Sequence, residues 1–192
     1  MFRRGFKTWA EEVALRVRSK LRLEPAGPLD PLQLAGLLSV PVLRPDDLSA
    51  LPDDCKGRLR NDHSDSWSAI TVTNGKHYLI VINANHAPTR RNSDLAHELA
   101  HIILGHEPSM MFASPGSGIA LRTHNKEQED EANWLAGCLL LPRDALFTIR
   151  RRRLSDEEAC RTYGVSSAML RFRLNASGVD IQLQRAAKWR TT

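Results

Sequence analysis

The residues most able to carry chemistry in this sequence form the pentapeptide His97-Glu98-Leu99-Ala100-His101. On a helix, side chains at positions i and i+4 share one face, so His97 and His101 would lie close enough to bind the same metal ion. Imidazole nitrogens suit zinc, and zinc lowers the pKa of a bound water toward about 7. Glu98 would stand where a carboxylate can take a proton from that water. The pentapeptide therefore predicts a hydrolytic zinc site, with His97 and His101 as ligands and Glu98 as the catalytic base.

The residues around this pentapeptide predict that it lies on a helix. Ser93 is a good N-cap, and Gly105 is a residue at which helices commonly end. The same five-residue pattern also occurs by chance in proteins that bind no metal. A capped helix from about Ser93 to Leu104, with the apolar run 102–104 directly after the second histidine, favours the metal site over chance.

A catalytic zinc needs a third protein ligand and one open coordination position. His106 is the nearest candidate, but Gly105 and His106 do not have the spacing of the HExxHxxGxxH pattern. A second candidate is Glu129, which lies near the start of a helix that we expect from Asn125, as N-cap, to Pro142. The acidic start of this second helix is the better source of the third ligand.

Glu129 begins a stripe of small and apolar positions at helical spacing. The stripe continues through Ala132, Asn133, Ala136, Leu139 and Leu140. Such a stripe is expected to lie against the helix with the two histidines, so the Glu129 carboxylate would enter the metal site and Asn133 would orient a histidine from behind. Glu131 stays an alternative ligand. Glu127 and Asp130 are better explained as a solvated acidic first turn that favours the helix dipole.

Apolar periodicity, caps and turn residues predict the remaining elements. Helices are expected at 6–20 and, with Asp30 as N-cap, at 31–38; strands at 41–43, 68–73 and 77–83; and short helices at 143–152, 156–163 and 167–175. Asn74-Gly75 predicts a tight hairpin between the two longer strands. The segment 46–54 is rich in turn residues, and 106–124 is expected to be a long loop. The predicted fold class is α+β, with a small β-sheet or hairpin packed on the two site helices.

Composition narrows the class of protein. The chain has 192 residues, of which 42% are hydrophobic, and it contains no apolar run long enough to cross a membrane and no apolar segment of a secretory signal. Its three cysteines are far apart and form no CxxC pair, which argues against a disulfide framework or a thiolate metal site. We therefore expect a cytoplasmic protein. The net charge of +5 permits association with nucleic acid but does not require it.

Several blocks of the sequence, in this order, resemble the ImmA/IrrE family of metallopeptidases. They are residues 4–11, 29–31 with 34–35, 78–83, 95–104, and 129–136 with 139–142. Leu135 stands where the family usually has Phe and Leu141 where it usually has Met, and both are conservative changes in packing residues. The resemblance implies a zincin-like core, a zinc ion held by an HExxH motif plus Glu, and a helix-turn-helix repressor as substrate. We expect that repressor to be a separate protein encoded nearby.

The chain is predicted to divide into a zincin-like metallopeptidase domain, 1–142, and a helical C-terminal subdomain, 143–192. The segment 155–179 is loosely similar to a helix-turn-helix, although Ala159 and Gly164 are one residue further apart than is usual. We therefore expect no sequence-specific DNA recognition by this subdomain. The arginines of this subdomain could still contact the phosphates of nucleic acid without reading its sequence. They are Arg150, Arg151, Arg152, Arg153, Arg161, Arg171 and Arg173.

Two classes of function follow from these residues. In the first, the protein is a zinc-dependent endopeptidase; in the second, it is a non-proteolytic regulator that binds DNA or a repressor and whose zinc site is structural or senses metal. The intact Glu98 favours the enzyme, because a structural site needs neither this carboxylate nor an open position. The residue that stabilises the transition state stays open among four candidates. They are Tyr78, His106, Arg122 and His124.

Overall fold

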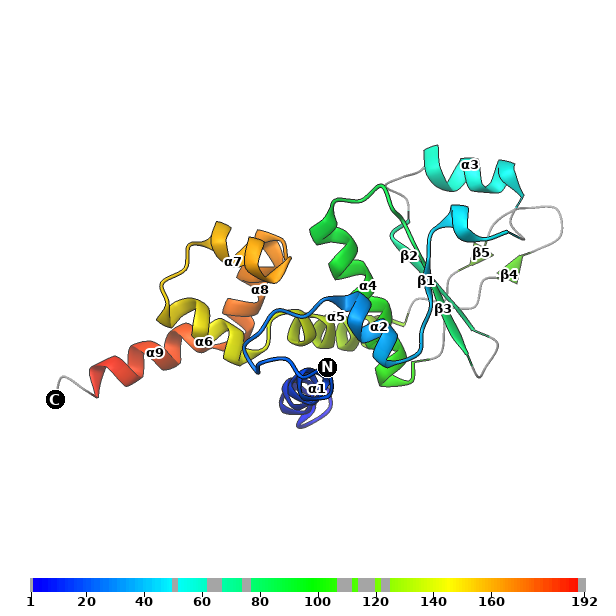
Figure 1. The fold of residues 1–192 in the computed structure, drawn as a ribbon. Helices are drawn as coiled ribbons and strands as arrows, with labels where there is room; N and C mark the ends of the chain where they lie inside the picture. The colour runs from blue at the N-terminus through cyan, green and yellow to red at the C-terminus, as the bar shows by residue number, and fades with distance from the viewer. Residues whose placement is uncertain are drawn as a thin grey trace.

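The computed structural model describes residues 2–49, 52–61, 67–73, 77–106, 112–113, 120–121 and 125–189. Its α+β architecture confirms the predicted fold class (Figure 1). The first half contains α1 (Phe6–Lys20), α2 (Pro31–Leu37), β1 (Val42–Leu43), the 3-10 helix η1 (Pro45–Asp47), α3 (Asp53–Asn61), β2 (Ala69–Thr73), β3 (Tyr78–Ile82) and α4 (Pro88–Leu104). The second half contains β4 (Phe112–Ala113), β5 (Ala120–Leu121), α5 (Lys126–Leu140), α6 (Arg143–Arg151), α7 (Asp156–Tyr163), α8 (Ser167–Ser177) and α9 (Val179–Lys188).

Within these residues, β1, β3 and β2 form one mixed sheet in that order. β2 and β3 are antiparallel, with Thr71 opposite Ile80, whereas β1 runs parallel to β3. The predicted pair of strands is confirmed, while its Asn74-Gly75 turn lies outside the described residues. The central strand β3 is therefore paired on both sides.

The elements that matter for the site are stacked in layers. Helix α4 packs on β2 and β3, α5 packs on α4, and α1 packs on α5 (Figure 1). Leu99 and Ala100 of α4 and Leu135 and Ala136 of α5 are at most 2% exposed, so the interface between the two site helices is closely packed. This packing holds the backbone that carries the polar residues of both helices.

Capping residues determine several helix ends as the sequence predicts. The Asp30 carboxylate accepts a hydrogen bond from Leu32 N at the start of α2, and the Asn125 side chain accepts from Glu127 N at the start of α5. Gly105 ends α4 in the left-handed conformation, at φ 66°. These caps fix where each site helix meets its loop.

Several elements differ from the prediction. The segment expected to be a long loop contains the antiparallel strands β4 and β5. Helix α4 begins at Pro88 rather than near Ser93, because proline suits the first helical position and the Ser93 hydroxyl donates to Thr89 O inside the helix. Helix α3 begins within the segment expected to be turns, and α9 follows α8 directly at Gly178. No helix in the described part of the chain combines the length and apolar character needed to cross a membrane.

The C-terminal helices lie against α5 through α8 (Figure 1). A Cβ at Gly137 of α5 would lie 2.8 Å from the Arg173 side chain, so a glycine is needed for this close approach. Arg173 is fully buried and Arg150 is paired with Asp180 through two hydrogen bonds, so neither presents a free guanidinium to phosphate. The boundary at residue 142 stays a prediction.

Candidate metal centre

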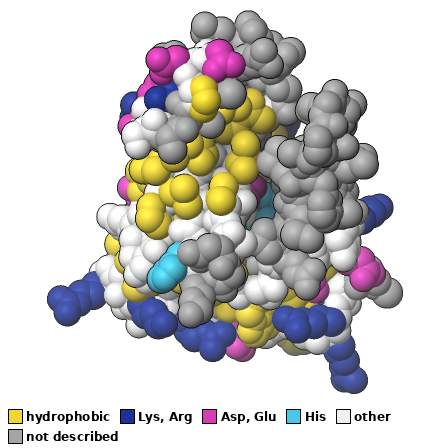
Figure 2. All heavy atoms as spheres, turned by 90° about the vertical axis from the view of Figure 1, so that its right-hand side faces the viewer, with side chains coloured by type: hydrophobic (Ala, Val, Ile, Leu, Met, Phe, Trp, Pro, Cys, Tyr) yellow, Lys and Arg dark blue, Asp and Glu magenta, His cyan; other side chains and the backbone are white. Residues whose placement is uncertain are grey.

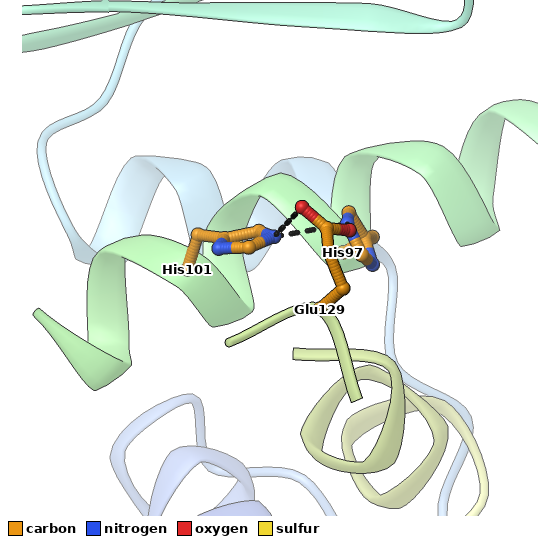
Figure 3. A group of neighbouring side chains, drawn as sticks. All are labelled: His97, His101 and Glu129. Atoms are coloured by element: carbon orange, nitrogen blue, oxygen red, sulfur yellow. Dashed lines mark hydrogen bonds and ion pairs between the residues drawn. The ribbon is translucent and has the colours of Figure 1, made fainter. Parts of the chain in front are cut away.

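Two turns of α4 and the first turn of α5 bring three side chains to one point (Figure 3). His97 Nε2 lies 3.0 Å from His101 Nε2 and 3.1 Å from Glu129 Oε2, and His101 Nε2 lies 3.6 Å from Glu129 Oε1. The side chains are 17–19% exposed, so they are shielded but still reachable from solvent. The three residues that the sequence suggested as ligands are thus neighbours.

The outer nitrogens of both histidines have hydrogen-bond partners, and the partner of His97 fixes where its proton lies. His97 Nδ1 is 3.0 Å from Asn133 Oδ1, an acceptor, so this nitrogen carries a proton and donates it. His101 Nδ1 is 3.0 Å from His106 Nδ1. With the outer nitrogens protonated, the neutral rings point two nitrogen lone pairs at each other and at a carboxylate oxygen. Such an arrangement is repulsive unless a proton or a metal ion lies among the three atoms.

The spacing of these atoms fits a metal ion. Bonds of about 2.0–2.1 Å at tetrahedral angles place neighbouring ligand atoms about 3.3 Å apart. The three observed distances, 3.0, 3.1 and 3.6 Å, surround that value. Among the described residues, His97, His101 and Glu129 each offer a possible metal-ligand atom, and these atoms all lie within 4.8 Å of one another.

The alternative ligands lie elsewhere. Glu131 Oε2 is 3.3 Å from His106 Nε2. The His106 ring contacts Nδ1 of His101, on the side of that ring that faces away from Glu129. Neither residue reaches the point where the ligand atoms converge. Of the three candidates, Glu129 is the one whose carboxylate oxygens lie beside Nε2 of both His97 and His101.

Of the four candidates for stabilising the transition state, two can be placed. The His106 ring contacts His101 and Glu131, and Tyr78 packs against the hydrophobic core. Arg122 and His124 lie outside the described residues. No candidate is singled out by the geometry.

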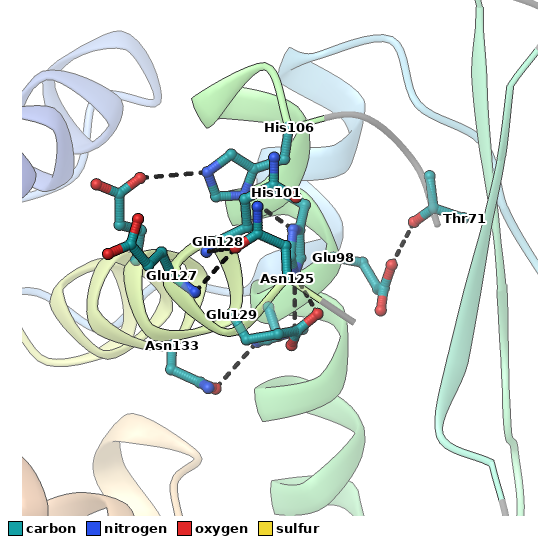
Figure 4. A network of polar contacts seen from close by, with 11 residues as sticks. Thr71, Glu98, His101, His106, Asn125, Glu127, Gln128, Glu129 and Asn133 are labelled. Atoms are coloured by element: carbon teal, nitrogen blue, oxygen red, sulfur yellow. Dashed lines mark hydrogen bonds and ion pairs between the residues drawn. The ribbon is translucent and has the colours of Figure 1, made fainter. Parts of the chain in front are cut away.

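Glu98 leaves α4 on the side that faces the sheet (Figure 4). Its residue is 7% exposed, and its Oε2 accepts a hydrogen bond from Thr71 Oγ1 on β2. The sheet therefore fixes the orientation of this carboxylate one residue away from His97.

The sequence did not single out Thr71 or the contact of His106 with Glu131. Thr71 is one of several β-branched residues in its strand, and only the register of β2 against α4 distinguishes it. An alternating pattern shows which strand residues share a face but not what they face. Asn133, by contrast, was expected to orient a histidine, and it contacts His97.

Comparison with known families gives a match that includes this centre. The sequence profile of the IrrE N-terminal-like domain, which belongs to a peptidase family, matches residues 56–175 of the 192. The matched segment contains β2, β3, α4 and α5, and therefore every residue of the centre. A comparison with curated proteins gives no match.

Proposed function

Because the chain belongs to the ImmA/IrrE family of metallopeptidases, we propose that it is a zinc-dependent endopeptidase that cleaves a regulatory protein, a helix-turn-helix repressor. The proposal has His97, His101 and Glu129 as the metal ligands and Glu98 as the catalytic residue. The observation that carries the proposal is that possible metal-ligand atoms of these three side chains converge. The Glu98 carboxylate lies beside them and is held by Thr71 rather than by the cluster. A structural zinc site would use a fourth protein ligand, and none lies at this cluster among the described side chains.

Zinc is the metal that best suits two imidazoles and one carboxylate with an open position. Bound there, it would supply a Lewis acid that lowers the pKa of a water toward about 7 and polarises a peptide carbonyl. In this proposal Glu98 accepts the proton of the attacking water and delivers it to the nitrogen of the leaving amine. Thr71 assists by holding Glu98 Oε2, so the carboxylate keeps one orientation during both transfers. Asn133 keeps the His97 ring turned toward Glu129.

The surface around the sheet supports a peptide substrate. Hydrophobic side chains gather on the face of the molecule that carries the sheet (Figure 2). Val72 of β2 is 48% exposed, and β2 is an outer strand among the described residues. An extended peptide could pair with such a strand but not with β3, which has neighbours on both sides. The repressor as substrate, and with it a role in transcription regulation, rests on the family resemblance. A place in the cytoplasm rests on the composition of the sequence.

The test replaces Glu98 with Gln, which has nearly the same shape but cannot accept the proton. We expect Glu98→Gln to bind zinc like the wild type and to lose cleavage by about 10²–10⁴-fold. Both proteins are incubated with the repressor encoded beside them, and fragments are followed by mass spectrometry. Glu127→Gln, which changes an exposed carboxylate on α5 to a carboxamide, serves as the control and should cleave like the wild type.

The outcomes separate the two classes of function. Equal cleavage by wild type and Glu98→Gln would remove Glu98 from the mechanism. Binding of the repressor without cleavage by either zinc-loaded protein would replace the endopeptidase with the non-proteolytic regulator.

A further inference from the structure

Behind the metal centre, a second pair of side chains is arranged in line with His101. We propose that His106 and Glu131 form a hydrogen-bonded relay that fixes the tautomer of His101 and strengthens its bond to the metal. Both act as positioning residues, since neither touches the point where the ligand atoms converge. The inference rests on the proposed metal site but not on the proposed substrate.

The relay is built by the end of α4 and the start of α5. Gly105 turns the chain in the left-handed conformation, and His106 N then donates to His101 O at 3.0 Å. This turn brings the His106 ring back over the His101 ring, with 5.0 Å between the ring centroids. Glu131 approaches the same imidazole from α5. The His106 side chain is 8% exposed and that of Glu131 is 23% exposed, so water screens their contact only in part.

When the His106 ring is neutral, one assignment of protons satisfies every contact in this line. A carboxylate only accepts hydrogen bonds, so His106 Nε2, 3.3 Å from Glu131 Oε2, must carry a proton. In a neutral ring His106 Nδ1 is then an acceptor, and His101 Nδ1, 3.0 Å away, donates to it. His101 Nε2 is left with its lone pair, on the side of Glu129. The carboxylate at one end of the line thus selects the tautomer that a metal ligand needs at the other end.

The two glutamates of α5 have distinct tasks for a geometric reason. Residues two apart on a helix point about 200° apart around its axis. Glu129 therefore reaches the inner face of the histidines while Glu131 reaches His106. A single ligand site could not use both side chains.

The other ligand provides an internal comparison. His97 Nδ1 donates to a neutral amide, Asn133 Oδ1, whereas His101 donates to a ring that is itself backed by a carboxylate. A negative charge behind a ligand histidine raises its basicity and its affinity for the metal. We therefore expect the relay to contribute more to metal affinity than Asn133 does.

The experiment measures the zinc dissociation constant of the full chain by competition with a chromogenic chelator. We expect Glu131→Ala and His106→Ala each to weaken zinc binding by about 10–100-fold. Asp130→Asn is the matched control, because it removes one negative charge from the neighbouring, exposed position and should change affinity less than about threefold. Thermal unfolding of the zinc-free proteins should be the same for Glu131→Ala and the control, which shows that the fold is intact.

A second variant makes the relay itself testable. His106→Asn places an amide oxygen near the former Nδ1 atom, where it can accept from His101 without help from Glu131. We expect His106→Asn to bind zinc more tightly than His106→Ala. In the His106→Asn background, Glu131→Ala should have no further effect, whereas the same change in the wild type has its full effect. An effect of equal size in both backgrounds would mean that Glu131 acts by its charge alone and would overturn the relay.

Ring-nitrogen NMR of the zinc-free protein gives a readout that is independent of metal and of catalysis. The wild type should show His101 as the tautomer protonated at Nδ1, and His106→Ala should show a mixture. A mixture in the wild type, or zinc affinities unchanged in both alanine variants, would overturn the inference while leaving the peptidase proposal intact. Loss of affinity as expected, with no cleavage of the repressor, would support the relay and count only against the substrate.

Discussion

Two polar clusters lie at opposite ends of α5, and they differ in whether hydrogen-bond donors face their acceptors. At the C-terminal end is the Glu11 cluster, formed by Glu11, Cys138, Arg143 and Arg173. Glu11 Oε1 accepts from Arg173 Nη2 at 2.6 Å and from Cys138 Sγ at 3.6 Å, and Glu11 Oε2 accepts from Arg143 N at 3.0 Å. Each carboxylate oxygen of this cluster has at least one protein donor, so its acceptors need no ligand, and the buried atom left over is a donor, Arg173 Nη1.

The metal centre at the other end of α5 has the opposite character. Its histidines donate outward, to Asn133 and His106, so the atoms that face inward are acceptors. Glu129 contributes another acceptor rather than a donor. Polar side chains at an interface between helices need no ligand when each acceptor faces a donor of the protein. When several acceptors converge without donors, they indicate a bound cation.

The largest difference between the clusters should appear in metal binding. Structural zinc sites gain about 10–16 kcal/mol from some four ligands, so loss of one ligand should cost several kcal/mol. We expect Glu129→Ala to weaken zinc binding on the order of 10²–10³-fold, and Glu11→Ala to leave it unchanged. Isothermal titration or chelator competition measures both. Tight zinc binding by Glu129→Ala would move the third ligand to another residue and remove the contrast.

Stability should respond in the reverse order. Glu11→Ala leaves the Arg173 guanidinium, which is fully buried, without its carboxylate, and breaking such a pair costs about 3–5 kcal/mol. Glu129→Ala should destabilise the zinc-free protein less, because it removes one of several mutually repelling acceptors. Urea unfolding of the zinc-free proteins measures both free energies. Glu12→Ala, on the exposed neighbour of Glu11, should stay within about 0.5 kcal/mol of the wild type.

The smallest effect concerns the cysteine of the Glu11 cluster. Burial raises the pKa of the Cys138 thiol from 9.0 to about 12, with Glu11 opposing ionisation as well. Because the thiolate is the reactive form, native protein at pH 8 should be alkylated at Cys160, which is partly exposed, well before Cys138. Mass spectrometry of peptides after timed alkylation gives both rates. Equal rates in the native state would contradict a closed cluster that buries the Cys138 thiol.

The same pKa shift gives a pH dependence of stability. The native state holds the Cys138 proton more tightly than the unfolded state does, so this contribution is complete below pH 9.0, where the unfolded thiol stays neutral. It is lost as the pH rises from 9.0 toward about 12. Cys138→Ala should therefore flatten the fall in the free energy of unfolding in this range.

Local signals in the sequence predicted much of the fold and the inner part of the site. Asp30, Asn125 and Gly105 mark helix ends because a cap depends on a residue and its own backbone. The proposed ligand set followed from the i, i+4 histidines and from the stripe that begins at Glu129, since both depend on the period of one helix.

Features that depend on contacts between distant segments were not predicted. The position of Thr71 beside Glu98 depends on how α4 crosses the sheet, and the contact of Glu131 with His106 depends on the turn at Gly105. The Glu11 cluster joins α1, α6 and α8, and no pattern within one segment indicates it. Ser93 misled the prediction because a serine can cap a helix or, as here, bond to the turn before it.

The most direct test of the converging acceptors is a crystal structure of the zinc-loaded protein, with anomalous data collected on both sides of the zinc absorption edge. The account predicts one zinc ion bonded to His97 Nε2, His101 Nε2 and a carboxylate oxygen of Glu129, with His106 and Glu131 hydrogen-bonded behind His101. A zinc ion bonded to His106 or Glu131 instead, or no anomalous peak among the three predicted ligands, would contradict it.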